Sequence, residues 1–298
     1  MNGMRLDTLV VGMDFGESSL TAARWAAQHL APAAELVLVH VIEAPPPPAF
    51  LRSVLPPYER MLELAREDAV RLMRELTRTL ESRRIRTEIR EGRPATEIAA
   101  VAGAARADLI VVAERGKDAS SRLLLGSTAE QLARCAPVPV LIARGLPEAG
   151  PRSVLVPIAD DEASLELLEW ARSFRERFAA AVTIVHALNT GLYGLFRFVR
   201  SEEELRGIER RARESAVAWA EERTRAAGFE PGAAAVEIDF GDPGFEIVAA
   251  ADRAAADLIL VGHRNAEAEA AGEVDRVARA VLRASSLPVL VLANRACG

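Results

Sequence analysis

Gly126, Ser127 and Thr128 form a small polar run directly before a helical pattern of apolar residues. Glycine lets an anion approach backbone N–H groups closely, and the first turn of a helix presents unpaired N–H groups at the positive end of its dipole. The two hydroxyls can donate hydrogen bonds to phosphate oxygens, and Gly116 opens the polar loop that precedes them. A structural alternative fits the same residues, because serine or threonine at this place can serve only as the helix N-cap. The run therefore indicates either a phosphate site or a capped helix.

The elements around this run alternate between short apolar strands and longer helical patterns. Uninterrupted apolar runs are typical of strands covered on both faces, and the alternation predicts right-handed crossovers in a parallel sheet. In such a sheet, ligands bind beyond the carboxyl ends of the strands, where the strand order reverses. The predicted strands are 7–13, 35–42, 85–90, 108–113, 138–143, 153–158, 181–187, 234–239, 257–262 and 287–293. The predicted helices are 17–30, 56–83, 94–106, 126–135, 162–178, 201–228, 243–255 and 271–284.

The chain contains an internal duplication, which is a sequence signature to seek before any other. Trp25 corresponds to Trp170, and His40 at the end of the second strand corresponds to His186. The later segments, GRPATEIAAVAGAARADLIVVAERG and GDPGFEIVAAADRAAADLILVGHRN, align without a gap. We therefore predict an α/β fold with two tandem doubly wound parallel-sheet domains.

The predicted domains are residues 1–145 and 152–298, joined by a linker at 143–153 that is rich in glycine and proline. Two loops break the symmetry of the duplication. Residues 44–57 contain four consecutive prolines and predict a stiff polyproline-like arm. Residues 189–200 carry several aromatic side chains, which either fold onto the domain or form an exposed lip for a partner or ligand.

The loop after the fourth strand of the first half resembles a motif of the universal stress protein family in its tandem two-domain form. Nucleotide-binding members of that family carry Gly-x2-Gly-x9-Gly-[Ser/Thr] at this place. The frame falls here on Ala113, Gly116, Gly126 and Ser127, so that the first glycine is replaced. The family's aspartate at the end of the first strand matches Asp14, and the terminus of its second strand matches Val41.

This resemblance implies a Rossmann-like fold of the adenine nucleotide alpha hydrolase type that binds ATP or a related adenine nucleotide, with or without Mg²⁺. It implies that Asp14 positions the ribose or a hydrated Mg²⁺, and that Val41 meets the adenine through backbone groups. It also implies that Gly116 and Gly126 shape the phosphate cradle. The Ser127 and Thr128 hydroxyls would donate hydrogen bonds to the phosphates.

Two features of the loop depart from the family pattern. Ala113 adds a methyl group where the backbone should lie against the nucleotide. Glu114 places a negative charge in the phosphate loop, which Arg115 and Lys117 could offset. Both features weaken the expectation of nucleotide binding without removing it.

The second half predicts a degenerate nucleotide site. The same frame falls on Gly262, Asn265, Asp275 and Arg276, and the intervening loop contains Glu267, Glu269 and Glu273. Ungapped alignment also places Ala159 opposite Asp14. Because like charges repel a polyphosphate, we expect the second domain to be mainly structural.

The histidines offer two interpretations. Because His40 and His186 occupy the same place in both halves, we expect them to bond to neighbouring backbone. A weaker alternative gathers Asp160, Asp161, His186 and His263 around a divalent metal. No nucleophile–histidine–acid frame with elbow glycines is present.

Bulk properties exclude several other classes. The net charge of −6 gives no broad attraction to nucleic acid or anionic lipid, and no apolar run is long enough for a membrane span. The two cysteines fit neither a disulfide framework nor a zinc spacing, and we expect Cys135 to be buried. Without a signal peptide, the expected location is the cytoplasm.

We therefore expect a stress-response regulatory protein with an adenine nucleotide in domain 1. It is not expected to be an enzyme beyond slow ATP hydrolysis, because no general base or Walker lysine stands out. The fifth strands, 138–143 and 287–293, are apolar edges that predict an internal pseudo-dimer or a homodimer. The alternative is a scaffold or small-ligand module that binds no nucleotide and acts through protein contacts.

Overall fold

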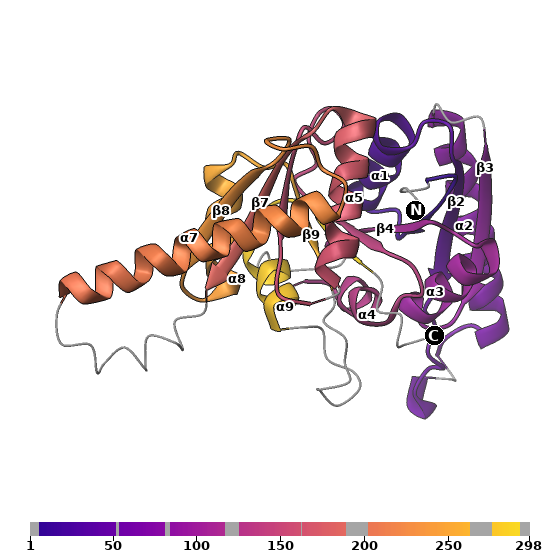
Figure 1. Cartoon of the computed structure of the whole chain (residues 1–298). Coiled ribbons are helices and arrows are strands. Elements are labelled where there is room, and N and C mark those ends of the chain that lie inside the picture. Colours follow the sequence, from indigo (N-terminus) through magenta and orange to yellow (C-terminus); the bar gives the residue numbers. More distant parts are fainter. Residues whose placement is uncertain are drawn as a thin grey trace. The chain divides into compact units, whose positions relative to one another are not determined.

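The computed structural model describes residues 6–51, 54–80, 84–116, 125–161, 163–188, 202–262 and 276–292. Two compact units divide this chain between residues 149 and 150. Each unit is a parallel sheet with helices on both of its faces (Figure 1).

The first unit has five parallel strands in the order β3-β2-β1-β4-β5. They are β1 (Thr8–Met13), β2 (Glu35–Ile42), β3 (Ile85–Glu91), β4 (Leu109–Ala113) and β5 (Val140–Ala143). The central strands are almost entirely buried, whereas the edge strand β3 is partly exposed. Because β2 and β4 flank β1 on opposite sides, the strand order reverses at β1. The carboxyl ends of β1 and β4 therefore form the switch point at which such sheets bind ligands.

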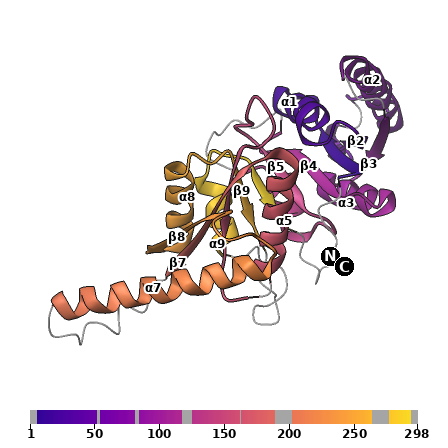
Figure 2. The same ribbon diagram turned by 45° about the horizontal axis from the view of Figure 1, so that its top comes forward.

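Six helical segments accompany this sheet: α1 (Glu17–Trp25), η1 (Ala26–Leu30), η2 (Ala49–Leu51), α2 (Tyr58–Thr79), α3 (Pro94–Ala105) and α4 (Ser127–Cys135). Helix α2 packs on β2 and β3, and α1 packs on β1 and β4. Helix α3 packs on β1, β2 and α4 across the other face of the sheet (Figure 2). This two-sided arrangement follows from right-handed crossovers that proceed in opposite directions from β1.

The second unit repeats the arrangement in the order β10-β9-β6-β7-β8, again with parallel pairs. Its strands are β6 (Ser153–Pro157), β7 (Ala181–Leu188), β8 (Ala235–Phe240), β9 (Leu258–Val261) and β10 (Val289–Val291). Its helices are α5 (Ala163–Phe178), α7 (Glu202–Ala226), α8 (Pro243–Arg253) and α9 (Arg276–Ala284). The predicted duplication of doubly wound sheets is thus confirmed.

Local signals explain where the helices begin and end. Pro94 and Pro243 lie in the first turns of α3 and α8, where the missing N–H is not needed. Asp242 caps α8 by accepting a hydrogen bond from the Gly244 N–H at 3.0 Å. Gly92 precedes α3 with φ 141°, a conformation that favours glycine.

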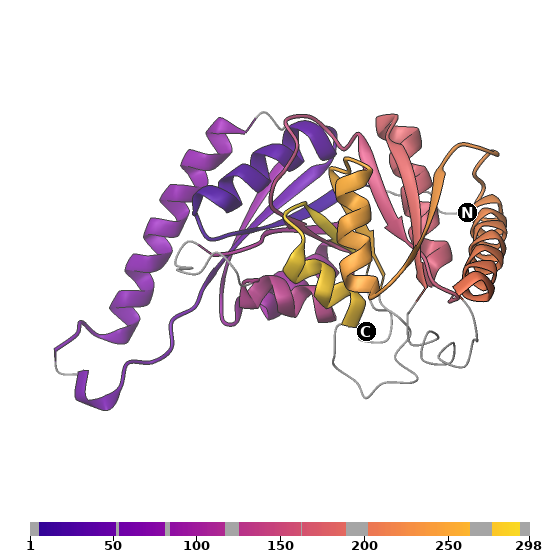
Figure 3. The same cartoon turned by 90° about the vertical axis from the view of Figure 1, so that its left-hand side faces the viewer.

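The structure differs from the sequence-based expectation at several places. The predicted helix 17–30 is α-helical only to Trp25 and continues as a π-helix. The predicted polyproline arm contains the 3-10 helix η2, which lies beyond the N-terminal end of α2 (Figure 3). Cys135 is exposed rather than buried, and it is the last residue of α4, beyond the buried Leu132 and Ala133. The aromatic loop 189–200 lies outside the described residues.

The paired histidines and the first tryptophan have structural roles. His40 Nδ1 lies 2.8 Å from the Met13 carbonyl oxygen, and His186 Nδ1 lies 2.8 Å from that of Ile158. Each histidine therefore ties the end of one strand to its neighbour, as we predicted. The Trp25 indole N–H reaches the linker, where the carbonyl oxygens of Pro147 and Ala149 accept at 2.8 and 3.1 Å. Among the described helices, none is long and apolar enough to cross a membrane.

Candidate functional site

Two of the sequence-predicted site residues meet at the carboxyl edge of the first sheet. Asp14 follows β1, and Gly116 follows β4 after two intervening residues. A Cβ atom placed on Gly116 would lie 3.3 Å from Asp14 Oδ2, so the aspartate faces the backbone of the loop. The parallel pairing of β1 with β4 produces this approach by bringing their carboxyl ends together.

Asp14 also has a structural role at the start of α1. Its Oδ1 atom accepts hydrogen bonds from the Gly16 N–H at 2.8 Å and from the hydroxyl of buried Ser19 at 2.5 Å. These bonds hold the turn that leads into the helix, because an aspartate that accepts from the N–H two residues later forms an Asx turn. The Oδ2 atom is the one that lies toward Gly116. Asp14 can therefore serve the fold and the cleft at the same time.

This role predicts a stability effect that is separate from any ligand. We expect Asp14→Ala to lower the free energy of unfolding by about 1 kcal/mol, because it removes the acceptor of the Gly16 and Ser19 hydrogen bonds. Asp14→Asn is the matched control, because its amide oxygen still accepts from Gly16 and Ser19. Urea denaturation measures both variants. An alanine variant as stable as the parent, or an asparagine variant equally weakened, would contradict the role of Asp14 in holding this turn.

Gly126 closes the loop onto the end of β4. Its N–H donates to the Glu114 carbonyl oxygen at 2.9 Å, and α4 begins at the next residue, Ser127. A Cβ atom at position 126 would lie 2.9 Å from that oxygen and 3.4 Å from Arg115 Cα. Glycine is therefore required at this close approach. Gly126 is the N-cap residue of α4, and Ser127 and Thr128 are the first two residues of the helix, so its first turn has no side-chain cap. Gly126 thus lets the loop backbone pack against the N-terminus of α4, where the unpaired N–H groups of a first helical turn favour an anion.

The remaining predicted residues lie on the strands that frame this cleft. Ala113 is the last residue of β4 and pairs with Ala143 of β5. Val41 lies in β2 opposite Arg90 of β3, one position beyond the last β1–β2 pair, which joins Met13 to His40. On its β1 side, Val41 thus lies past the end of the ladder, where a ligand could meet its backbone.

A charge cluster lies beside the loop. Glu114 Oε1 accepts from Arg144 Nη1 at 2.9 Å, and Glu114 Oε2 accepts from Arg115 Nη2 at 3.0 Å. The Arg144 side chain is 6% exposed, against 20% for Glu114 and 26% for Arg115. Burial lowers the pKa of Arg144 from its ordinary value, and Glu114 opposes this shift. The negative charge of Glu114 is therefore neutralised by two arginines, and Lys117 lies outside the described residues.

Arg144 and Phe15 are two residues of this region that sequence reasoning missed. Arg144 directly follows β5, and only the β4–β5 pairing reveals that it reaches Glu114. Phe15 adopts φ 61°, which is rare for a bulky residue, and its ring centroid lies 4.5 Å from that of His40. This places an aromatic ring between the carboxyl ends of β1 and β2. No short sequence motif marks either position.

The second unit preserves the framework of the cleft without its aspartate. The Ser164 hydroxyl accepts from the Ala159 N–H at 2.8 Å, as the Ser19 hydroxyl accepts from the Asp14 N–H at 3.4 Å. Ala159 therefore occupies the place of Asp14, in agreement with the ungapped alignment. In the second glycine frame, Gly262 follows β9 and Arg276 begins α9. Asn265, Asp275 and the acidic loop between them lie outside the described residues.

Helix α7 places its own side chains against the carboxyl edge of the second sheet. Arg223 pairs with Asp160, and its Nη1 donates to the Asp161 carbonyl oxygen at 3.1 Å. The Arg223 guanidinium lies 5.2 Å from the Trp219 ring centroid, which in turn lies 4.9 Å from that of His186. Arg223 and Trp219 thus contact residues at the ends of β6 and β7, where the Asp160 side chain is still 82% exposed, and the degenerate second site stays a prediction.

The metal alternative has no support in the described parts of the chain, where no group of three potential ligands is arranged to hold an ion. Asp160 is paired with Arg223, and Asp161 Oδ1 accepts from the Ser164 N–H and hydroxyl. His186 contacts Trp219, and His263 lies outside the described residues.

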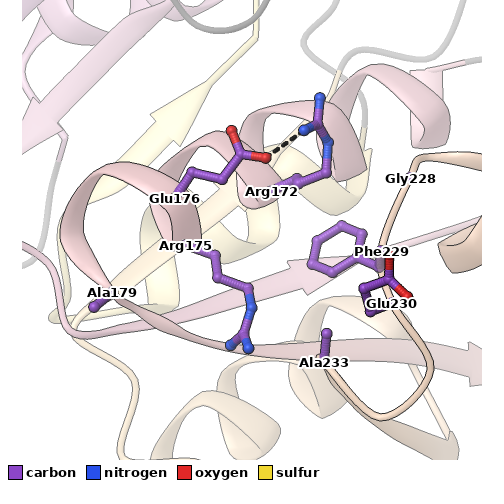
Figure 4. A pocket seen from close by; sticks show the side chains of 8 residues that line it. All are labelled: Arg172, Arg175, Glu176, Ala179, Gly228, Phe229, Glu230 and Ala233. Atoms are coloured by element: carbon purple, nitrogen blue, oxygen red, sulfur yellow. Dashed lines mark hydrogen bonds and ion pairs between the residues drawn. The ribbon is translucent and has the colours of Figure 1, made fainter.

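A pocket of about 410 Å³ lies elsewhere in the second unit (Figure 4). Arg172, Arg175 and Glu176 of α5 line one side, and Phe229 of the segment before β8 lines the other. Helix α5 precedes β7, and the segment with Phe229 precedes β8, so the pocket lies at the amino ends of these strands. Ligands of doubly wound sheets bind at the opposite, carboxyl ends.

The fold and the residues at the carboxyl edges of the sheets define a protein with two tandem doubly wound α/β domains, of which only the first has an aspartate at the position of Asp14. The family model described as "Universal stress protein family" matches residues 5–144 and 151–293. The chain belongs to this family.

Curated relatives agree with this assignment. A universal stress protein of Methanocaldococcus jannaschii is 37% identical over 89 residues, which cover 29% of this chain and 52% of that protein. One of Mycolicibacterium smegmatis is 32% identical over 146 residues, covering 46% of this chain and 48% of its own. One of Thermus aquaticus is 34% identical over 133 residues, covering 45% of this chain and 93% of its own. The matches thus span about half the length of the first two relatives.

Solved structures show the same fold over nearly the whole chain. A universal stress protein of Archaeoglobus fulgidus superimposes with a TM-score of 0.61 at 19% identity, covering 98% of this chain and 99% of that one. A protein of unknown function from Pseudomonas aeruginosa gives a TM-score of 0.63 at 17% identity, with 98% and 94% coverage. At these identities the likeness establishes the fold alone.

Proposed function

We propose that the first unit binds ATP or a related adenine nucleotide at its carboxyl edge, and that the second unit is mainly structural. The observation that carries this proposal is the approach of Asp14 to Gly116 beside the close packing of Gly126 on Glu114. The two glycines allow the loop backbone to lie close to Asp14 and to the N-terminus of α4, whose unpaired N–H groups favour an anion. The two arginines beside Glu114 neutralise its carboxylate, so that Glu114 does not leave a net negative charge in the loop.

Different residues of this chain would then contact the phosphates, the ribose and the adenine. Gly116, Gly126 and the first turn of α4 would hold the phosphates, with hydroxyl donors from Ser127 and Thr128. Asp14 Oδ2 would meet the ribose or a hydrated Mg²⁺ ion, and Val41 would present backbone to the adenine. Bound Mg²⁺ would neutralise phosphate charge. With no general base assigned, we expect hydrolysis to be slow or absent, which fits a regulator of the stress response in the cytoplasm better than an enzyme.

Purified protein should release adenine nucleotide on denaturation, or gain stability when ATP is added. At an ATP concentration about one hundred times the Kd, stabilisation of the native state is about 2.7 kcal/mol. We expect Ser127→Ala to reduce this gain, whereas Arg276→Ala at the same frame position of the second unit should leave it intact. Differential scanning fluorimetry with Mg²⁺-ATP makes the comparison. No shift at millimolar ATP, together with no released nucleotide, would reject the proposal.

The second candidate function is a scaffold that acts through protein contacts. One observation favours it: the arm around η2 exposes Phe50 by 76% and Val54 by 77%. Such exposure of large apolar side chains is typical of interaction surfaces. Failure of all adenine nucleotides in the experiment above would promote this function, and association of the fifth strands or of two chains stays a prediction.

A further inference from the structure

The charge cluster at the cleft contains one member that is fixed and one that can move. Arg144 is 6% exposed and bonded to Glu114 Oε1, so its position is set by the end of β5. Arg115 is 26% exposed and bonded to the other oxygen, Oε2. Among the described residues, the buried Arg115 Nε has no hydrogen-bond partner. A guanidinium group can donate five hydrogen bonds, so Arg115 has capacity that Glu114 does not use.

The position of Arg115 places this capacity at the phosphate cradle. Its Cα would lie 3.4 Å from a Cβ atom at Gly126, which immediately precedes α4. The next residue along the chain is Gly116, whose missing Cβ would approach Asp14. Arg115 therefore lies between the two glycines that shape the cleft, and its long side chain can reach either Glu114 or a ligand oxygen nearby.

We propose that Arg115 exchanges its partner when nucleotide binds, leaving Glu114 for a phosphate oxygen. Glu114 then competes with the phosphates for Arg115, and this competition limits how much the phosphates contribute to the binding affinity. Arg144 keeps Glu114 neutralised after the exchange, so that no carboxylate is left unpaired next to the ligand. The inference rests on the proposed nucleotide site and concerns the phosphate selectivity of that same site.

The exchange predicts opposite effects for the two partners, and only on ligands that carry phosphate. Because charge-assisted hydrogen bonds to a phosphate are each equivalent to about a tenfold change in affinity, Arg115→Gln should weaken ATP about tenfold. Glu114→Gln should tighten ATP by about three- to tenfold, because Arg115 no longer has a competing carboxylate. Adenosine has no phosphate, and its affinity should stay within about twofold in both variants.

The double variant separates an exchange of partners from simple charge repulsion. If Glu114 acts through Arg115, Glu114→Gln should give no gain in ATP affinity once Arg115 is glutamine. If Glu114 only repels phosphate, the gain should persist in the double variant, and this result would overturn the proposal. Coupling of this kind is what a double-mutant cycle measures.

Isothermal titration with ATP and with adenosine measures both affinities for the parent, the two single variants and the double variant, each as nucleotide-free full-length protein. Arg134 is an exposed arginine in the last turn of α4, and Arg134→Gln is the matched control for loss of one positive charge. It should change the affinity for neither ligand by more than about twofold. If Glu114→Gln does not fold, the affinities of Arg115→Gln for ATP and adenosine test the proposal. Arg115 is the more exposed partner, so its replacement disturbs the fold less. Equal effects of Arg115→Gln on ATP and adenosine, or no effect on ATP, would overturn the exchange while leaving the nucleotide site. Failure of both ligands to bind the parent protein would overturn the site itself.

Discussion

Gly126→Asp should abolish the stabilisation of the protein by ATP. A side chain at this position meets the Glu114 carbonyl oxygen at 2.9 Å, so the loop must move away from β4. The aspartate would also bring a negative charge to the first turn of α4, where the phosphates are expected. We expect no ATP-dependent shift at concentrations that stabilise the parent by about 2.7 kcal/mol.

The control for this prediction is Gly103, which lies in α3 with nothing within 4 Å of an added Cβ. Gly103→Asp introduces the same side chain and charge without a steric conflict, so ATP should stabilise it as it does the parent. Gly126→Ala separates shape from charge, because its methyl group meets the same oxygen. Undiminished ATP binding by Gly126→Asp would show that the cradle lies elsewhere.

Arg144→Met should produce a large loss of stability without any ligand. It removes the main partner of Glu114, whose side chain is only 20% exposed, and leaves Arg115 as the remaining cation. Removing one member of a buried ion pair costs about 3–5 kcal/mol, and the partial exposure of Glu114 should bring the loss to about 2–3 kcal/mol. Urea denaturation, followed by circular dichroism, measures this difference.

The double variant Arg144→Met with Glu114→Gln is the informative comparison. It removes the charge that Arg144→Met leaves behind, and it should recover more than half of the lost stability. Arg60→Met provides a control on an exposed ion pair with Glu63, where both side chains are more than half exposed and the stability should stay close to that of the parent. A double variant as unstable as Arg144→Met would mean that Arg144 stabilises the edge of β5 by packing alone.

The sequence predicted the elements of the fold because their signals are local or repeated. Apolar runs such as LIVVA identify buried strands, and the matched positions of His40 and His186 indicated their backbone bonds correctly. The aspartate and the glycines could be assigned to one edge because parallel strands end on the same side of a sheet. Whether these residues bind nucleotide stays a prediction.

The features that could not be predicted depend on pairings between distant elements. Arg144 follows a strand that gives no indication of the carboxylate it will meet, and its role arises only from the β4–β5 pairing. Trp219 and Arg223 appear in the sequence as ordinary residues of a long amphipathic helix. Their contacts with Asp160 and His186 depend on the path of α7 across its sheet, which periodicity does not specify. Cys135 was wrongly predicted to be buried, because its average preference did not reflect its place in the last turn of α4.

The stoichiometry of ATP binding tests the division of labour between the two units most directly. Nucleotide-free full-length protein titrated calorimetrically with Mg²⁺-ATP should bind one equivalent per chain, and Gly126→Asp should bind none. Two equivalents would contradict the structural role of the second unit. Complete absence of binding by the parent chain would contradict the nucleotide site of the first.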